Sequence, residues 1–177
     1  MQDEENLIRR AQQQDEEAFT QLYEEYFDKI YRYITLKIGN QTEAEDLTQQ
    51  VFVKVLQSIS SFRWKGIPFS AWLFRIAHNQ VVDYFRKEKK YVTTPLDESL
   101  RDGNIDPQLA VERKLDIEQL ILATKQLTKA QREVISLRFA SELSITQVAK
   151  IMGKSEGAVK ALQHSAIVAL RKTLSVA

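Results

Sequence analysis

The chain has 177 residues, of which 44% are hydrophobic and 28% charged, and its formal net charge is +1. This length allows one ordinary domain or two small ones. The absence of cysteine excludes disulfides and thiolate chemistry, and an aliphatic, charged composition poor in Gly and Pro favours helices over sheet. No run is long enough to span a membrane, and Met1 to Arg10 lacks the apolar core of a signal peptide. We therefore expect a cytoplasmic protein without membrane insertion.

Three helices are predicted before residue 60. The first covers residues 4–13, and the second, capped by Asp15, ends at Gly39-Asn40. We expect a capping box over Thr42–Glu45 to start the third, whose exposed polar side chains would be Glu45, Asp46, Gln49 and Gln50. The residues alone favour a solvated first turn for this polar quartet.

The fourth predicted helix covers residues 70–90 and follows a loop in which rings alternate with cations. Phe62-Arg63-Trp64-Lys65 opens that loop, and Gly66 and Pro68 interrupt any regular element before Phe69. At about 100° per residue, Arg75, Asn79, Val82 and Arg86 share one face, opposite Leu73, Ala77 and Tyr84. Bases stack on rings while cations follow phosphates, so this combination suits single-stranded nucleic acid. An ordinary bundle helix with its aromatic residues in the core is an equally open alternative.

The positive charges gather in two segments of the chain. Residues 63–90 carry seven Lys or Arg against two Asp or Glu, and residues 128–177 carry eight against three. By contrast, residues 1–62 carry six against twelve, and residues 91–127 carry four against seven. Two separated basic surfaces favour a polyanion bound at two places, with acidic surfaces left for another partner.

Residues 91–108 are expected to be a linker, because this acidic stretch contains two of the three prolines and no hydrophobic periodicity. It would divide the chain into an N-terminal bundle, 1–90, and a C-terminal bundle, 109–177. The second bundle should open with a helix over 109–127, followed by a capping box over Thr128–Gln131.

The residues that follow show the pattern of a helix-turn-helix. A capping box over Ser144–Gln147 starts a short helix, Gly153 allows a left-handed turn, and Ser155 caps a longer helix. The second helix of this motif enters the major groove of DNA. We expect Lys160, Gln163 and His164 to contact base edges or phosphates, and the surrounding cations to hold the backbone: Arg132, Arg138, Lys154, Arg171 and Lys172. A plain helical hairpin is the alternative.

Taken together, these stretches resemble the extracytoplasmic-function (ECF) group of bacterial RNA polymerase sigma factors, in the sigma-70 family. The matching stretches run in family order: DEEAFTQLYEEY, TEAEDLTQQVFVKV, FSAWLFRIAHNQVVDYFRK and QREVISLRFASELSITQVAKIMGKSEGAVKALQH. The resemblance implies an all-α fold of two small bundles joined by a flexible linker, with sigma domain 2 at 1–90 and sigma domain 4 at 109–177. It implies no catalysis and no cofactor, but promoter recognition and strand opening for core RNA polymerase.

The same resemblance implies a partner for each surface. The polar quartet would bind the clamp coiled coil of the largest polymerase subunit, and the first helices of the C-terminal bundle would bind the flap. The minus-10 element, as melted non-template strand, would meet Arg63, Phe69, Trp72, Arg75, Asn79 and Arg86. The minus-35 duplex would meet Lys154, Ser155, Lys160, Gln163, His164 and Arg171. An anti-sigma factor holding both domains is also expected.

The sequence departs from the commonest family pattern in a few places. The loop before Trp72 is one residue longer, Ser165 and Ile167 stand where Arg is frequent, and Gln147 stands where Glu is frequent. Minus-35 recognition should therefore rest on fewer charged contacts, with more of it carried by Lys160 and His164.

Two other functions remain open from the sequence. A stand-alone helix-turn-helix regulator with an N-terminal sensing or dimerisation bundle would account for residues 128–174, but not for the ring and cation loop. An enzyme using His78, Asn79 and Asp83 is disfavoured, because the spacing of five between His78 and Asp83 suits one helical site poorly. No nucleophile, phosphate-binding loop or metal cluster accompanies them in the sequence.

Overall fold

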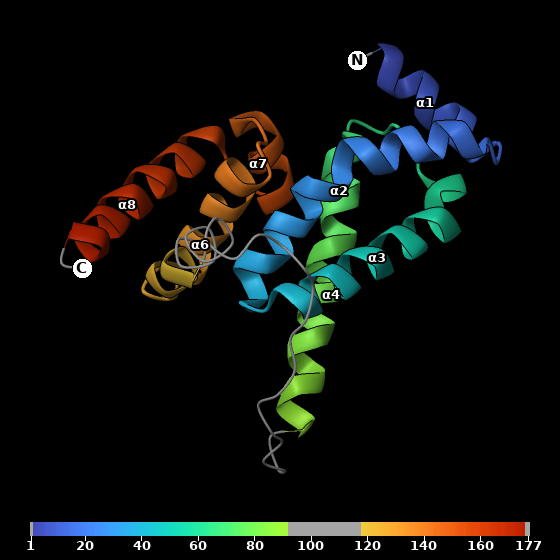
Figure 1. The fold of residues 1–177 in the computed structure, drawn as a ribbon. Coiled ribbons are helices and arrows are strands. Elements are labelled where there is room, and N and C mark those ends of the chain that lie inside the picture. Colours follow the sequence, from blue (N-terminus) through green and yellow to red (C-terminus); the bar gives the residue numbers. More distant parts are fainter. Residues whose placement is uncertain (1, 92–117, 176–177) are drawn as a thin grey trace, which may run out of the picture.

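A computed structural model describes residues 2–91 and 118–175, and every regular element in those ranges is helical (Figure 1). The expected all-α class is therefore confirmed. The predicted linker beyond Tyr91 and the first part of the helix predicted over 109–127 lie outside the described residues. The elements are α1 (Gln2–Gln12), α2 (Glu16–Ile38), α3 (Gln41–Ser58), η1 (Ile59–Ser61), α4 (Phe69–Tyr91), a helix over 118–125, α6 (Lys129–Ile135), η2 (Ser136–Ala140), α7 (Ile145–Met152) and α8 (Glu156–Ser175).

Helix boundaries in the N-terminal part follow local chemistry. Asp15 caps α2 by accepting the amide of Ala18, and Gly39 ends this helix in the left-handed conformation at φ 73°. The capping box predicted at Thr42 is wrong: Asn40 caps α3, and its side chain accepts the amide of Glu43. Asn40 is extended, directly after the left-handed glycine, and Asn is at least as good a cap as Thr, so α3 begins two residues earlier than expected.

Helices α1 to α4 pack around a core rich in aromatic rings. Its largest fully buried side chains include Tyr33, Phe69 and Phe74. The predicted division of α4 is confirmed at most positions, because Leu73 and Ala77 are buried while Arg75, Asn79, Val82 and Arg86 are exposed. In Figure 1 the last turns of α4 extend away from the body, and residues 85–89 are all exposed.

The C-terminal part is built from capped short helices and one long one. The capping boxes predicted at Thr128 and Ser144 are confirmed with both reciprocal hydrogen bonds, and Gly153 ends α7 at φ 62°. The sequence did not predict η2, a π-helical turn that the Ser141 amide closes by donating to the Ser136 carbonyl at 3.1 Å. Phe139, within this turn, is 51% exposed.

The two parts pack against each other through two pairs of elements, α2 with η2 and α4 with α7. Buried residues of the C-terminal part, including Val134, Leu137 and Val148, belong to the same apolar cluster as the core of α1 to α4. Polar contacts also cross this boundary: for example, Ser141 Oγ donates to the Lys29 carbonyl at 3.0 Å, and Gln147 Nε2 donates to Ser70 Oγ at 3.1 Å. The described residues therefore form one packed body.

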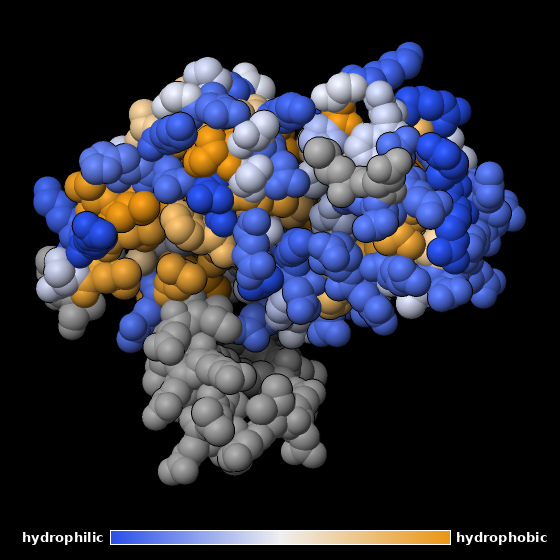
Figure 2. Space-filling model, turned by 90° about the horizontal axis from the view of Figure 1, so that it is seen from above, coloured by the Kyte–Doolittle hydropathy of each residue, from blue (hydrophilic) through white to orange (hydrophobic). Residues whose placement is uncertain are grey.

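The two sides of this body differ at the surface. In Figure 2, apolar side chains gather on the left, where the C-terminal helices lie, whereas the side formed by the N-terminal helices is largely hydrophilic. Exposed apolar residues of the C-terminal part are Leu120, Leu122, Phe139, Val168 and Leu174. Among residues 2–91 and 118–175, no helix has the length and apolarity needed to cross a bilayer.

Candidate nucleic-acid interface

Four aromatic rings cluster where the ring and cation loop meets the start of α4. The ring of Phe62 lies at the centre, with centroids 5.3 Å from Trp64, 5.3 Å from Trp72 and 5.5 Å from Phe69. Such separations are typical of edge-to-face and tilted ring packing. The exposed fraction rises outward, from 1% for Phe69 and 3% for Phe62 to 43% for Trp64. The cluster is thus rooted in the core and open to solvent at one end.

The loop that carries these rings is held by hydrogen bonds to its backbone. Gln12 Nε2 of α1 donates to the carbonyl oxygens of Ile59 at 3.0 Å and Phe62 at 2.9 Å. The Arg63 guanidinium donates to the carbonyls of Ser60 at 2.6 Å and Phe62 at 2.8 Å. Gly66 takes φ 72°, with open space around its Cα. These hydrogen bonds therefore fix the start of the loop, and the left-handed Gly66 turns the chain further along it.

Of the six residues predicted for the minus-10 element, four are exposed: Arg63, Arg75, Asn79 and Arg86. Trp72 is partly buried at the edge of the ring cluster. Phe69 is buried and packs against Tyr26, with ring centroids 5.6 Å apart, so its ring is not available for the direct contact that the sequence predicted. Its ring instead contacts that of Trp72, with centroids 5.6 Å apart.

Residues predicted for the minus-35 element lie on the turn and the outer face of the helix-turn-helix. Lys154, Lys160, His164 and Arg171 are exposed. The hydroxyl of Ser155 is also exposed but already accepts the amide of Ala158 at 3.2 Å, as the predicted cap. Gln163 is half-buried, and its Oε1 accepts a hydrogen bond from Arg138 Nε at 3.0 Å. Arg138 therefore positions Gln163 rather than standing free at the surface.

The polar quartet predicted to bind polymerase is exposed on α3, as expected for Glu45, Asp46, Gln49 and Gln50. Sequence reasoning missed two apolar neighbours on the same helix, Val53 and Leu56, whose exposed fractions are 54% and 58%. They follow Gln49 at intervals of four and three, so they lie on the same side of α3. The signal was available in the sequence, because the core stripe of Leu47, Val51 and Val55 leaves these two positions outside it.

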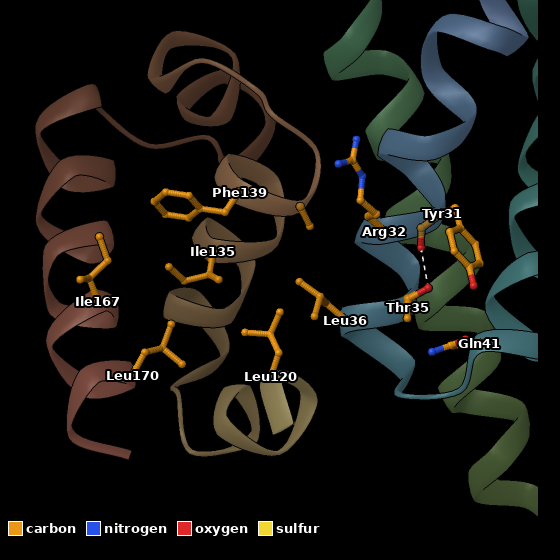
Figure 3. Close-up of a pocket in the computed structure, with 11 residues that line it drawn as sticks. Tyr31, Arg32, Thr35, Leu36, Gln41, Leu120, Ile135, Phe139, Ile167 and Leu170 are labelled. Carbon is orange, nitrogen blue, oxygen red and sulfur yellow. Dashed lines mark hydrogen bonds between the residues drawn. The ribbon is translucent and has the colours of Figure 1, made fainter. Parts of the chain in front are cut away.

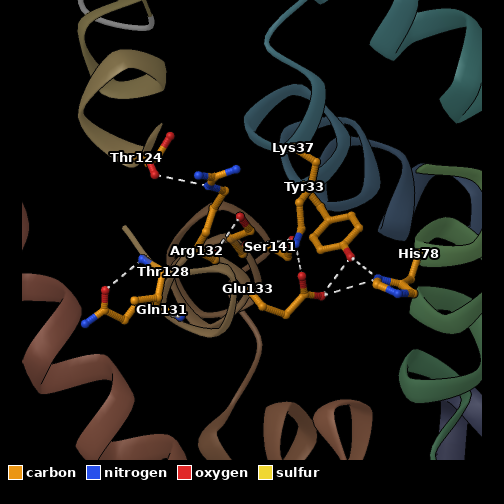
Figure 4. Close-up of polar contacts among 10 residues, drawn as sticks. Tyr33, Lys37, His78, Thr124, Thr128, Gln131, Arg132, Glu133 and Ser141 are labelled. Atoms are coloured by element: carbon orange, nitrogen blue, oxygen red, sulfur yellow. Dashed lines mark hydrogen bonds and ion pairs between the residues drawn. The ribbon is translucent and has the colours of Figure 1, made fainter. Parts of the chain in front are cut away.

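A polar network joins the two packed parts (Figure 4). Glu133 of α6 forms an ion pair with Lys37 of α2 and accepts a hydrogen bond from Tyr33 Oη at 2.8 Å. His78 Nδ1 of α4 lies 3.2 Å from the same Tyr33 oxygen. The side chains of Lys37 and Glu133 are only 9% and 12% exposed, and burial raises the pKa of Tyr33, which keeps its hydroxyl protonated as a donor.

His78 and Asp83, considered above as parts of an enzyme site, have separate surroundings. His78 faces Tyr33 and Glu133, whereas Asp83 contacts Arg86 of its own helix at 3.4 Å. Within the described ranges, no group of three His, Asp or Glu residues is arranged to hold a metal ion.

An apolar cavity of about 530 Å³ opens between α2 and the C-terminal helices (Figure 3). Leu36 of α2 points toward Leu120 and Ile135 across it, and Thr35 and Phe139 also line it. Ile167 and Leu170 of α8 complete the far wall. A cavity of this size and apolarity suits side chains of a helix inserted from a partner.

Two family models match separate parts of the chain. Residues 22–91 match the model of sigma-70 region 2, and residues 123–172 match that of sigma-70 region 4. Two solved structures, each 24% identical in sequence, share the fold. CnrH in complex with the cytosolic domain of CnrY has a TM-score of 0.74, and the match covers 96% of both chains. RpoE of Bartonella quintana in complex with the anti-sigma factor NepR has a TM-score of 0.67, and the match covers 89% of this chain and 97% of that one.

Three bacterial ECF sigma factors are among the proteins similar to this chain in sequence. BldN of Streptomyces coelicolor is 37% identical over 95% of this chain, which spans 64% of the length of BldN. SigW of Bacillus subtilis is 33% identical over 94% of both chains, and SigX of the same organism is 32% identical over 91% of this chain and 86% of its own. The chain therefore belongs to the ECF RNA polymerase sigma factors of the sigma-70 family, which initiate transcription with RNA polymerase and are not enzymes.

Proposed function

We propose that the ring cluster and the exposed face of α4 capture the melted non-template strand of the minus-10 element. The observation that carries this proposal is the ring cluster, which is fixed in the core at Phe69 and open to solvent at Trp64. An unstacked base could stack on the exposed rings, while Arg75 and Asn79 supply a cation and an amide beside them. Moving a base out of the duplex costs a few kcal/mol, which stacking and hydrogen bonding can offset. In this assignment Phe69 supports Trp72 and does not touch DNA.

The C-terminal helix-turn-helix would recognise the minus-35 element as intact duplex. Lys160 and His164 lie on the outer face of α8, where side chains can reach base edges or phosphates. Lys154 and Arg171, near the ends of the motif, would hold the phosphate backbone. Ser155 and Gln163 would act chiefly by shaping the start of α8 and its surface, because each is already hydrogen-bonded within the protein.

The exposed polar and apolar side of α3 would bind the clamp coiled coil of the largest polymerase subunit. A surface that combines Asp46 and Gln49 with exposed Val53 and Leu56 offers charge, amide groups and apolar area to one partner helix. The exposed apolar surface of the C-terminal part would bind the polymerase flap, because Phe139 and Leu122 are more than half exposed.

Promoter binding by both parts would require them to separate. Elements named minus-35 and minus-10 lie about 25 base pairs apart, or about 85 Å of duplex at about 3.4 Å per pair. A compact chain of 177 residues has a radius of gyration of about 16 Å and hence a diameter of about 40 Å. The 26 residues 92–117 could span about 85 Å if fully extended. The packed arrangement is therefore a resting form in this proposal.

An anti-sigma factor is a further proposed partner, acting in the cytoplasm before polymerase is engaged. Two solved structures with the same fold are complexes with such regulators or with a cytosolic partner domain. The apolar cavity between α2 and the C-terminal helices is a suitable place for an apolar helix of that partner.

Run-off transcription with core bacterial RNA polymerase tests the proposal. Randomised promoter fragments are transcribed with and without the full-length protein, and the enriched upstream regions are sequenced. We expect protein-dependent transcripts that share two short upstream elements. Duplex binding without any protein-dependent transcript would contradict the proposal and favour a stand-alone helix-turn-helix regulator.

A further inference from the structure

A second cavity, of about 550 Å³, lies between the C-terminal half of α4 and the start of α6. Five cations line it: Lys37 of α2, Arg86 and Lys89 of α4, and Lys129 and Arg132 of α6. We call this cavity the basic cleft. Its apolar wall consists of Val81, Val82 and Phe85 of α4, and the last two are 37% and 42% exposed. Its volume lies within the range of small-molecule sites.

The cations of the basic cleft come from both packed parts of the chain. Within the described residues, the carboxylates paired with them are Glu133, which is bound to Lys37, and Asp83, which is 3.4 Å from Arg86. Neither carboxylate lines the cleft. The Arg132 guanidinium donates to the carbonyls of Thr124 and Lys125, at 3.1 and 3.3 Å, so neutral acceptors orient it and its charge remains.

Two titratable groups at the basic cleft have pKa values lowered by burial and by the nearby cations. Burial, with Arg132 and Lys129 nearby, lowers the pKa of Lys37 to about 8 despite its ion pair with Glu133. Burial, with Lys37 and Lys129 nearby, also lowers the pKa of His78. Burial is the larger cause in both cases, and the nearby cations shift the two pKa values in the same direction. Packing α4 against the C-terminal part therefore brings like charges together, and a bound anion would relieve that repulsion.

We propose that the basic cleft binds a nucleoside triphosphate or a closely similar phosphorylated nucleotide, and that the bound ligand holds the two parts of the chain together. The phosphates would lie among Lys89, Lys129 and Arg132, where charge-assisted hydrogen bonds are available. The base would lie against Val82 and Phe85, which offer an apolar and aromatic surface. A ligand that contacts α4 and α6 at once stabilises the packed form selectively.

Promoter DNA is a poorer occupant of the basic cleft than a nucleotide. The cleft exists only while α4 and α6 are packed together, and that arrangement is too short to reach both promoter elements at once. This step, and the expected effect on transcription, rest on the proposed function, whereas nucleotide binding itself does not. The ligand would therefore lower promoter occupancy without entering either DNA-binding surface.

Isothermal titration of the full-length protein tests binding directly, with ATP, GTP and tripolyphosphate at matched ionic strength and without added Mg²⁺. We expect one site, and at least one nucleotide bound several-fold more tightly than tripolyphosphate. Lys89→Ala with Lys129→Ala should weaken nucleotide binding at least tenfold. The matched control, Lys54→Ala with Lys150→Ala, removes the same charge from exposed positions outside the cleft and should leave binding unchanged.

Three outcomes would overturn the proposal: no nucleotide binding, an equal loss in both double variants, or tripolyphosphate bound as tightly as the nucleotides. The first excludes a site, the second indicates diffuse charge, and the third indicates an anion patch without a nucleoside surface. None of these depends on transcription, so failure here is distinguishable from failure of the sigma function.

Packing of the two parts against each other can be measured in the same protein. The chain has no cysteine, so two can be introduced for labelling. Gln57→Cys and Ser175→Cys place one dye on α3 and one on α8, both at exposed positions. We expect the bound nucleotide to shift the distance distribution towards the short, packed population. An unchanged distribution at saturating nucleotide would contradict the assigned role in closure.

Discussion

The two proposed nucleic-acid surfaces of this sigma factor are made of different side chains. The N-terminal surface places four rings beside cations and an amide, whereas the sequence of α8, Glu156–Ser175, contains no Phe, Tyr or Trp. Rings can stack on bases only after those bases leave the duplex, while Lys and His can reach groove edges and phosphates of intact DNA. This difference agrees with our proposal that strand opening and duplex recognition belong to separate parts of one chain.

The cores of the two parts also differ in their content of aromatic rings. The N-terminal part buries large rings at Tyr33, Phe69 and Phe74, so its binding surface rests on a rigid base. The C-terminal part has a small cluster of its own around Leu127, Ile135 and Ala166, and other buried apolar residues, including Val134 and Leu137, join the N-terminal core. Variants that affect only one part should therefore separate the two functions.

The largest effect is expected for Phe69→Ala, which removes the ring at the base of the N-terminal surface. Because Phe69 is 1% exposed and contacts Tyr26, Phe62 and Trp72, the variant should lose about 3–5 kcal/mol of unfolding free energy. Denaturant unfolding measures this loss. Trp64→Ala is the control, because its ring is 43% exposed, and a loss as large as that of Phe69→Ala would contradict the assigned support role.

A smaller effect is expected for Lys160→Glu in the C-terminal part. If Lys160 touches a base, binding of the minus-35 duplex by the reconstituted holoenzyme should weaken by about 1–3 kcal/mol, and by less if it meets only phosphate. Titration at fixed salt measures the change, and Lys125→Glu makes the same charge change at an exposed position outside α8. Equal losses in the two variants would remove Lys160 from the interface.

Replacing the cap of α3 should cost about 1 kcal/mol. Asn40→Ala removes the side chain that accepts the Glu43 amide at 3.1 Å, whereas Thr42→Ala leaves that hydrogen bond intact. Thermal or denaturant unfolding should therefore rank Asn40→Ala below Thr42→Ala in stability. The reverse order would restore the cap predicted from sequence.

The smallest expected effect is a pH dependence at the boundary between the two parts. Burial, with Lys37 and Lys129 nearby, lowers the pKa of His78, so the unfolded chain takes up the proton first as pH falls below about 6.5. Unfolding free energy should then fall more in the wild type than in His78→Gln, by less than about 1 kcal/mol because the side chain is 41% exposed. Parallel pH profiles between pH 7.5 and 5.5 would contradict this contribution.

Local signals in the sequence predicted most helix boundaries. Asp15, Thr128 and Ser144 cap the helices assigned to them, because capping depends on residues within one turn. The same rule failed at Thr42, since a left-handed Gly39 followed by Asn40 offers an earlier start. The π-helical turn η2 was not predictable from periodicity, because Ser141 also bonds to Lys29, which is 112 positions away.

The exposed candidate residues were predictable from helical geometry, whereas the contacts between the two parts were not. Arg75, Asn79 and Lys160 are exposed where a spacing of three to four places them. The pairing of Lys37 with Glu133 joins residues 96 positions apart, and the burial of Phe69 depends on its contact with Tyr26. Such pairs follow from how helices pack, which one sequence alone does not specify.

Permanganate footprinting of the reconstituted holoenzyme tests most directly whether strand capture and duplex recognition belong to separate parts. It measures unpaired thymines in the minus-10 region at saturating holoenzyme, for Trp72→Ala and Lys160→Glu. Because the ring acts only on the opened strand, Trp72→Ala should keep promoter binding but lose thymine reactivity. Lys160→Glu should need more holoenzyme to bind, yet recover wild-type reactivity at saturation. Full reactivity in Trp72→Ala, or the same loss in both variants, would contradict the separation of strand capture from duplex recognition.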